Sequence, residues 1–268
     1  ERQILATLAA VASDQLELRR TSRRLGEELA ERHAIERRKD ELVAMVSHEL
    51  RSPLTAIAGS LGLLSRGAAG TLPDQAKRLV DVAHRNSQKL ELIVNDILEV
   101  ERLAAGEVNF RQASFPVAPL VAQAVEAMRP FAQKFGVELH LMGPDQPALT
   151  GSGDPDRTLQ VMDNLLSNAI KFSPAEHQVD VSVEDFGSAA RIAVRDRGPG
   201  IANEIRGRIF ERFTMAEAPA RRGASSGLGL NIARFIVLAQ QGEIGFDSPL
   251  PDGGTRFWFT IPKAVVES

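Results

Sequence analysis

The chain has 268 residues, a net charge of −3 and 43 % hydrophobic residues, so it is long enough for two domains that each bury a core. Its acidic and basic residues are interspersed, so we expect no nucleic acid partner. The absence of cysteine excludes disulfides and thiolate chemistry. No apolar run approaches the ~20 residues that span a bilayer, and there is no secretory signal. We therefore expect a cytoplasmic location with no membrane segment and, because the first residue is Glu1, a piece of a longer protein.

Residues 4–64 are predicted to be mainly helical, because Pro53 is their only proline and apolar residues recur at helical spacing. A coiled-coil repeat is indicated by residues seven apart, namely Ile4, Val11, Leu18 and Leu25. The next clear apolar residue of this repeat is Ile35, which lies three positions beyond the place where the seven-residue spacing from Leu25 would put it. Such an insertion of three residues is called a stammer. Two interpretations stay open: a spacer helix with an imperfect repeat, or a register switch that passes on an upstream signal.

The segment 65–74 contains Gly67, Gly70 and Pro73, which should end this helix and reverse the chain. A second amphipathic helix is predicted from about Asp74 to Leu103. Its apolar stripe consists of Leu79, Val82, Leu90, Ile93, Ile97 and Val100. Because two antiparallel helices bury two such stripes poorly, we expect a second copy of the chain to complete a four-helix bundle, as a homodimer.

The region beyond Gly106 alternates short β-type runs with helical runs. The predicted strands are "VELHLM", "VDVSVE", "ARIAVRD" and "TRFWFTIP", and the predicted helices cover residues 119–135, 156–172 and 229–241. This order indicates helices over one sheet. The predicted fold class is therefore α+β, with a coiled-coil helix and helical hairpin followed by an α/β sandwich, and a boundary near residues 106–114.

A histidine in the stretch "SHELRSPLT", residues 47–55, is predicted to face water. At about 100° per residue, His48 lies away from the apolar stripe of Val46, Leu50, Leu54 and Ile57. Glu49 can accept from one imidazole nitrogen and leave the other with a lone pair. Pro53 removes a backbone donor and loosens the helix. From these residues alone, a solvated surface histidine and a functional one are both open.

The stretch "DNLLSNAIKFS", residues 163–173, places Asn164, Asn168 and Lys171 on one helix face, with apolar residues on the other. An amide oxygen can bind Mg²⁺, and an ammonium can neutralise a phosphate. Two glycine-rich turns follow. "DRGPGI", residues 196–201, sets a carboxylate before two glycines, and "SSGLGLNIARF", residues 225–235, opens a helix whose N–H groups suit phosphate oxygens.

In this order, the stretches resemble the sensor histidine kinases of two-component signalling. "SHELRSPLT" resembles the phosphoacceptor box, "DNLLSNAIKFS" the asparagine box, "DRGPGI" and "SSGLGL" the two glycine boxes, and "IFERF" the phenylalanine box. The similarity implies a linker helix at 1–37, a dimerisation and phosphotransfer domain at 38–108 and a Bergerat-type ATP-binding domain at 112–268. Residues 4–24 are similar to the last helix of a GAF-type domain, which implies an upstream sensor domain.

The resemblance implies that ATP, with Mg²⁺, phosphorylates His48, which passes the phosphoryl group to the receiver domain of a response regulator. It also implies that Glu49 is the general base, that Asn168 binds the metal beside Asn164, that Lys171 meets the phosphates and that Asp196 reads the adenine amino group. The remaining residues expected around the nucleotide are Phe172, Gly198, Gly200, Ile201, Gly227, Leu228, Gly229 and Thr255. The parity of Thr255 with Phe257, Phe259 and Ile261 predicts that it points inward, and residues 202–224 are the expected lid.

Three positions depart from the family pattern. Ser52 stands where threonine or asparagine assists phosphatase activity, so that activity is left open. Phe172 replaces a frequent tyrosine and Ser225 a frequent glycine. The competing interpretations are an ATPase of the same fold, which the amide of Asn164 disfavours because related ATPases use a glutamate there, and a degenerate kinase acting as a scaffold. The sequence does not fix the input signal, the regulator or whether phosphorylation crosses the dimer.

Overall fold

The computed structural model describes Arg19, Arg23, Leu50 and residues 53–68, 70–142, 149–214 and 227–264. His48, Glu49, Ser52, the predicted coiled coil and part of the predicted lid lie outside the described residues. The chain divides into two units, Glu1–Glu49 and Leu50–Ser268, and every element named below belongs to the second. None of the helices described in the structure is long and apolar enough to cross a membrane.

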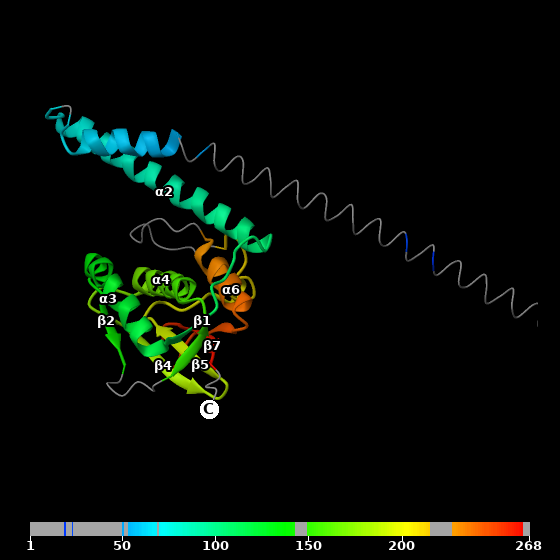
Figure 1. The fold of residues 1–268 in the computed structure, drawn as a ribbon. Helices are drawn as coiled ribbons and strands as arrows, with labels where there is room; N and C mark the ends of the chain where they lie inside the picture. Colours follow the sequence, from blue (N-terminus) through cyan, green and yellow to red (C-terminus); the bar gives the residue numbers. More distant parts are fainter. Residues whose placement is uncertain are drawn as a thin grey trace, which may run out of the picture. The chain divides into compact units, whose positions relative to one another are not determined.

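A helical hairpin opens the second unit, as predicted. A helix over residues 53–65 is followed by a turn, with Gly67 and Gly70 at φ of 81° and 93°, and by α2 (Asp74–Ala104). The two helices lie side by side (Figure 1) and are joined by hydrogen bonds from Ser65 Oγ to Asp81 at 2.5 Å and from Thr55 Oγ1 to Glu91 at 3.1 Å. The buried apolar residues of this hairpin include Leu54 and Ala58 on the first helix and Val94 and Leu98 on α2.

The apolar stripe predicted for α2 divides between two environments. Its N-terminal members Leu79, Val82 and Leu90 are exposed in a single chain, with Leu79 67 % accessible. Val100 is 1 % exposed and belongs to the core of the α/β lobe, against which Ile97 also packs. The sequence analysis assigned this stripe to a four-helix bundle, but its C-terminal end packs against the lobe.

The α/β lobe contains a five-stranded sheet in the order β2-β4-β5-β7-β6. These strands are β2 (Glu138–Leu141), β4 (Gln178–Phe186), β5 (Ala189–Arg195), β6 (Ile244–Asp247) and β7 (Arg256–Pro262). Only the β2–β4 pair of this sheet is parallel. The short strands β1 (Ala113–Pro116) and β3 (Thr150–Gly153) form a separate antiparallel pair.

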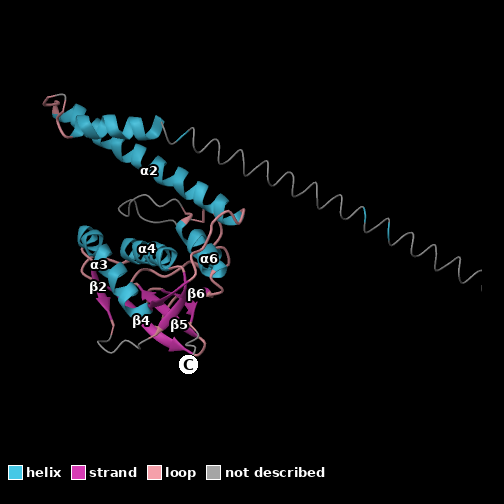
Figure 2. Cartoon of the chain, in the orientation of Figure 1, coloured by secondary structure: helices cyan, strands magenta, loops and turns pink. Residues whose placement is uncertain are grey.

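Helices α3 (Val117–Phe135), α4 (Pro155–Phe172) and α6 (Gly229–Ala239) cover one face of the sheet (Figure 2), and α5 (Asn203–Arg206) is a single turn. The side chain of Asp154 caps α4 by accepting from the backbone N–H groups of Asp156 and Arg157. Gly136 ends α3 in the left-handed conformation at φ 66°. The predicted strands and helices are confirmed, whereas β1, β3 and β6 were not anticipated.

Ion pairs connect the C-terminal part of α2 to the lobe. Glu99 accepts from Arg157 at 2.6 Å and from Gln160 at 2.7 Å. Glu101, only 7 % exposed, pairs with Arg212 of the "IFERF" segment. A buried carboxylate needs such a partner, because its transfer from water is otherwise costly.

We predict that Arg212→Met lowers the free energy of unfolding by about 1–3 kcal/mol, because it removes a charged partner of a buried carboxylate. Urea denaturation followed by the fluorescence of Trp258, the sole tryptophan, measures this. The matched control is Arg208→Met, since Arg208 pairs with Glu211 in water and its replacement should leave the free energy of unfolding nearly unchanged. Equal effects of the two substitutions would contradict a structural role for the Glu101 pair.

Candidate functional site

The site is organised around Asp196, which directly follows β5 and is 4 % exposed. Its Oδ1 atom accepts from the backbone N–H of Gly198 at 2.7 Å and of Thr255 at 3.2 Å. Its own backbone N–H donates to the Thr255 carbonyl at 2.8 Å. The carboxylate is therefore fixed between the glycine-containing turn 196–201 and the residue that precedes β7.

Thr255 is 3 % exposed. The alternate residues of β7 that follow it are buried as well, with exposed fractions of 7 % for Phe257, 1 % for Phe259 and 3 % for Ile261. The predicted inward orientation is thus confirmed. The Thr255 hydroxyl lies 3.0 Å from that of Ser248. Ser248 was not among the predicted residues, because it belongs to a short loop after β6 with no recognisable motif.

Two glycines of the predicted boxes lie against α4. A Cβ atom on Gly198 would come within 2.7 Å of the Phe172 carbonyl oxygen and 2.9 Å of Asp196 Oδ1. A Cβ atom on Gly229 would come within 2.9 Å of Asn164 Oδ1. Only glycine fits at these distances without movement of the neighbours. The structure therefore brings the asparagine box and both glycine boxes together.

The turns themselves also require glycine at two positions. Gly200 has φ 81° and Gly227 has φ 71°, the left-handed region that other residues rarely adopt. Ile201 is half-buried and Leu228 is 1 % exposed, so the apolar residues next to these glycines face the interior. Leu228 precedes the first residue of α6, so the second glycine box lies at the N-terminal end of that helix.

On α4, Asn164, Asn168 and Lys171 are half-buried, whereas the opposite face, which includes Leu165 and Ile170, is fully buried. Burial lowers the pKa of Lys171, and the charge of Asp96 on α2 offsets only part of this effect. The Lys171 ammonium also lies 6.0 Å from the centre of the Phe131 ring. A cation with incomplete hydration is thus available beside the site.

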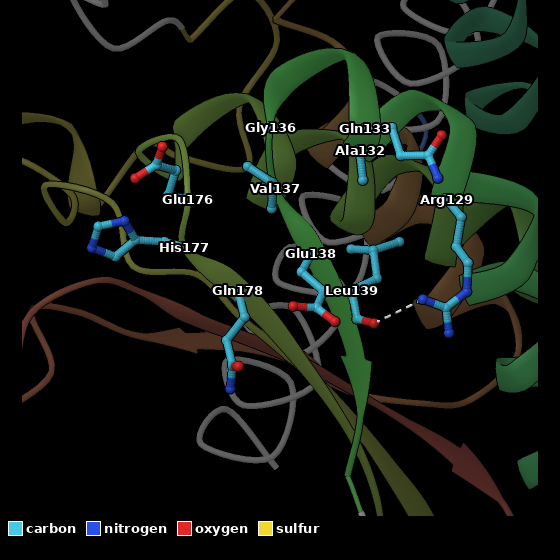
Figure 3. Close-up of a pocket in the computed structure, with 10 residues that line it drawn as sticks. All are labelled: Arg129, Ala132, Gln133, Gly136, Val137, Glu138, Leu139, Glu176, His177 and Gln178. Atoms are coloured by element: carbon cyan, nitrogen blue, oxygen red, sulfur yellow. Dashed lines mark hydrogen bonds between the residues drawn. The ribbon is translucent and has the colours of Figure 1, made fainter.

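Two other features bear on ligands. Among the described residues, no group of three or more histidine, aspartate or glutamate side chains could hold a metal ion. A pocket of about 520 Å³ lies between the end of α3, β2 and residues 176–178 (Figure 3). Arg129 lines one side of it and donates to the Leu139 carbonyl at 3.1 Å, and Glu176 and His177 line another part. None of the predicted nucleotide residues lines this pocket.

Comparison with protein-family models finds two matches. Residues 38–106 match the His Kinase A (phospho-acceptor) domain. Residues 153–265 match the family of histidine kinase-, DNA gyrase B- and HSP90-like ATPases.

Similar curated proteins include the "Non-motile and phage-resistance protein" of Caulobacter vibrioides, 31 % identical over 98 % of this chain and 32 % of the relative. The sensor histidine kinase AruS of Pseudomonas aeruginosa is 35 % identical over 94 % of this chain and 25 % of its own length. The signal transduction histidine-protein kinase BarA of Escherichia coli is 31 % identical over 95 % of this chain and 28 % of its own length. The chain thus spans a third or less of the length of each of these relatives.

Among solved structures, full-length ShkA in complex with AMPPNP has a TM-score of 0.69 and 32 % identity, covering 84 % of this chain and 46 % of that one. Histidine kinase ThkA in complex with the response regulator protein TrrA has a TM-score of 0.59 and 26 % identity, covering 84 % of this chain and 61 % of that one.

We predict that Gly198→Ala lowers the free energy of unfolding by about 1–3 kcal/mol, because the added methyl group overlaps the Phe172 carbonyl. Urea denaturation measures the loss. Gly207→Ala is the matched control, since Gly207 has a helical φ of −64° and no atom within 4 Å of an added Cβ. A Gly198→Ala chain as stable as the Gly207→Ala chain would show that the close approach is not required.

Proposed function

The chain belongs to the sensor histidine kinases of two-component signalling, and we propose that it phosphorylates its own His48 from ATP and passes the phosphoryl group to an aspartate of a response regulator. The observation that carries this proposal is the buried carboxylate of Asp196, held by two backbone amides where the glycine boxes meet α4. That arrangement lies in the region similar to kinase ATPases, downstream of a histidine in the region similar to phosphoacceptor domains.

In the proposed reaction, a nitrogen of His48 with a free lone pair attacks the γ-phosphorus of ATP and the bond to the ADP oxygen breaks. Before attack, Glu49 would accept a hydrogen bond from the protonated nitrogen of the neutral ring. As the nitrogen–phosphorus bond forms, Glu49 would take that proton, so that the phosphorylated ring carries no positive charge. Catalysis of phosphoryl transfer requires mainly that the nucleotide is positioned and that the charge of its phosphates is neutralised, so the lobe needs few groups that react themselves. The same nitrogen–phosphorus bond then breaks when a receiver aspartate attacks.

The nucleotide is proposed to bind with its adenine amino group donating to Asp196 and its phosphates beside Lys171 and the N-terminal end of α6. Asn168 is proposed to supply an amide oxygen to Mg²⁺, next to Asn164. Magnesium typically keeps waters and phosphate oxygens as most of its ligands, so one amide from α4 fits an ion that arrives with ATP. Phe172, Gly198, Gly200, Ile201, Gly227, Leu228, Gly229 and Thr255 would complete the walls.

A second copy of the chain is the proposed partner of the helical hairpin. Leu79, Val82 and Leu90 of α2 are exposed, as are Ile57 and Leu63 of the preceding helix. Two hairpins with such faces would bury them in a four-helix bundle. The chain spans a third or less of its relatives' length, which supports further domains in the full protein. From the similarity of residues 4–24 we propose that one of them is a GAF-like sensor domain, and we propose a cytoplasmic location for this chain.

We predict that His48→Gln abolishes the acid-labile, base-stable label that the wild-type chain acquires from γ-labelled ATP and magnesium. Autoradiography after gel electrophoresis measures the label, and sedimentation checks that the dimer persists. His177→Gln is the matched control, because His177 is an exposed histidine outside the proposed site and its loss should leave labelling unchanged. Undiminished labelling of the His48→Gln chain would rule out this residue as the acceptor.

We also predict that ATP affinity declines at alkaline pH. Because burial lowers the pKa of Lys171, its charge is present below that pKa and is lost as the pH rises through it, earlier than for an exposed lysine with a pKa of about 10.4. Calorimetric titration with a non-hydrolysable ATP analogue between pH 7 and pH 10 measures this. Lys171→Arg should flatten the profile, since the guanidinium stays charged, whereas Lys134→Arg should not. Parallel profiles for all three chains would exclude Lys171 as the phosphate partner.

A further inference from the structure

The turn that carries Asp196 is anchored from the far side of the sheet. Along β5, Ile192 and Val194 are buried in the core beneath the helices, so the side chains between them face the other way. Asp196 continues the buried series, and Arg197 continues the outward one. These two neighbours therefore point to opposite faces, one toward the proposed nucleotide and the other toward the face opposite α3, α4 and α6 (Figure 2).

Arg197 joins two carboxylates on that outer face. Its guanidinium donates to Asp180 of β4 at 2.8 Å and to Asp252 at 3.2 Å. Asp180 also accepts from Gln178 at 2.7 Å, and Asp252, in the loop between β6 and β7, pairs with Arg195 as well. The planar fork of an arginine can bind two acceptors at once. One side chain thus connects the glycine-containing turn to β4 and to the neighbouring loop.

The backbone of this turn is poorly constrained by its own residues. Gly198 and Gly200 follow Arg197 closely, and glycine can adopt a wide range of φ and ψ angles. The backbone N–H of Arg197 donates to the Ser173 hydroxyl at 3.4 Å, which is long for a hydrogen bond. Because ordering flexible residues costs conformational entropy, the turn needs an anchor, and the ion pairs of the Arg197 side chain supply one.

Burial makes the pair with Asp180 the stronger of the two. The side chain of Asp180 is 6 % exposed, whereas that of Asp252 is 57 % exposed. Removing one partner of a buried pair leaves an uncompensated charge and is costly, whereas exposed pairs contribute little. His140 lies 3.4 Å from Asp180 as well, but it is charged only when protonated. Arg197 is therefore the permanent cation at this carboxylate.

We propose that Arg197 and Asp180 are positioning residues that hold Asp196 in the orientation that accepts from the adenine amino group. Arg197 lies between Asp196 and Gly198 in the chain, and the Gly198 N–H binds the Asp196 carboxylate at 2.7 Å. A turn held toward Asp180 therefore keeps both the carboxylate and its amide donor in place, although neither positioning residue touches the ligand. This inference rests on the proposed ATP-binding function.

The experiment is a calorimetric titration of the whole chain with a non-hydrolysable ATP analogue and magnesium, at a temperature at which urea denaturation shows every variant to be folded. Arg197→Gln and Asp180→Asn each release the arginine from β4. We expect each substitution to weaken binding about three- to tenfold, the effect of one net hydrogen bond to the adenine. Because all the chains are folded, a loss of stability alone leaves the dissociation constant unchanged.

Arg256→Gln is the matched control. Arg256 directly follows Thr255, as Arg197 follows Asp196, and it also pairs with a carboxylate, that of Asp247 at 2.9 Å. Its backbone, however, is held by the pairing of β7 with β5 and β6. Loss of this ion pair should therefore leave the affinity for the ATP analogue unchanged.

An Asp196→Asn background separates positioning from a general structural role. If Arg197 acts through the Asp196 carboxylate, adding Arg197→Gln to Asp196→Asn should weaken binding no further. The same additional loss in that background, or wild-type affinity in both the Arg197→Gln and the Asp180→Asn chain, would overturn this inference alone. A wild-type chain that does not bind the analogue would overturn the proposed function as well.

Discussion

The buried carboxylate of Asp196 is the constraint on which the rest of the site depends. An ionised group at this depth is tolerated only if hydrogen-bond donors surround it, and the backbone N–H groups of Gly198 and Thr255 supply them. Both donors lie next to the ends of β5 and β7, which are neighbouring antiparallel strands. The loops that follow and precede those strands must approach each other closely, and an added Cβ on Gly254 would overlap the Asp196 carbonyl. The glycines are therefore a consequence of placing a carboxylate there.

Opposite charges also hold the C-terminal part of α2 against the lobe. The C-terminal part of α2 presents Asp96, Glu99 and Glu101, and each interacts with a cation of the lobe, namely Lys171, Arg157 and Arg212 respectively. Lys171 is a proposed phosphate ligand, so Asp96 and the proposed nucleotide would act on the same side chain. The hydrophobic contact of Val100 with the lobe core lies among these pairs. Packing and charge thus reinforce one another along a short length of helix.

Much of this arrangement could be predicted because it depends on local patterns. The alternation in β4, β5 and β7, the amphipathic faces of α2 and α4, and the inward parity of Thr255 are properties of consecutive residues. Strands such as β3, "TGSG", and β6, "IGFD", contain four residues with little alternation and form through pairing with distant segments. Likewise, the contact of Ser248 with Ile201 and the pair of Glu101 with Arg212 join residues 47 and 111 positions apart. The periodicity of neighbouring residues cannot predict contacts between residues so far apart in the sequence.

The division of the α2 stripe has a consequence for how its length can change. One inserted residue would turn everything that follows by about 100°. An insertion near the middle of the helix would therefore rotate Val100 and the acidic row away from the lobe, even though every side chain upstream kept its place. The 31 residues of α2 therefore set the spacing and the relative orientation of two apolar surfaces, the exposed one that includes Leu79 and the one at Val100 that packs in the lobe core.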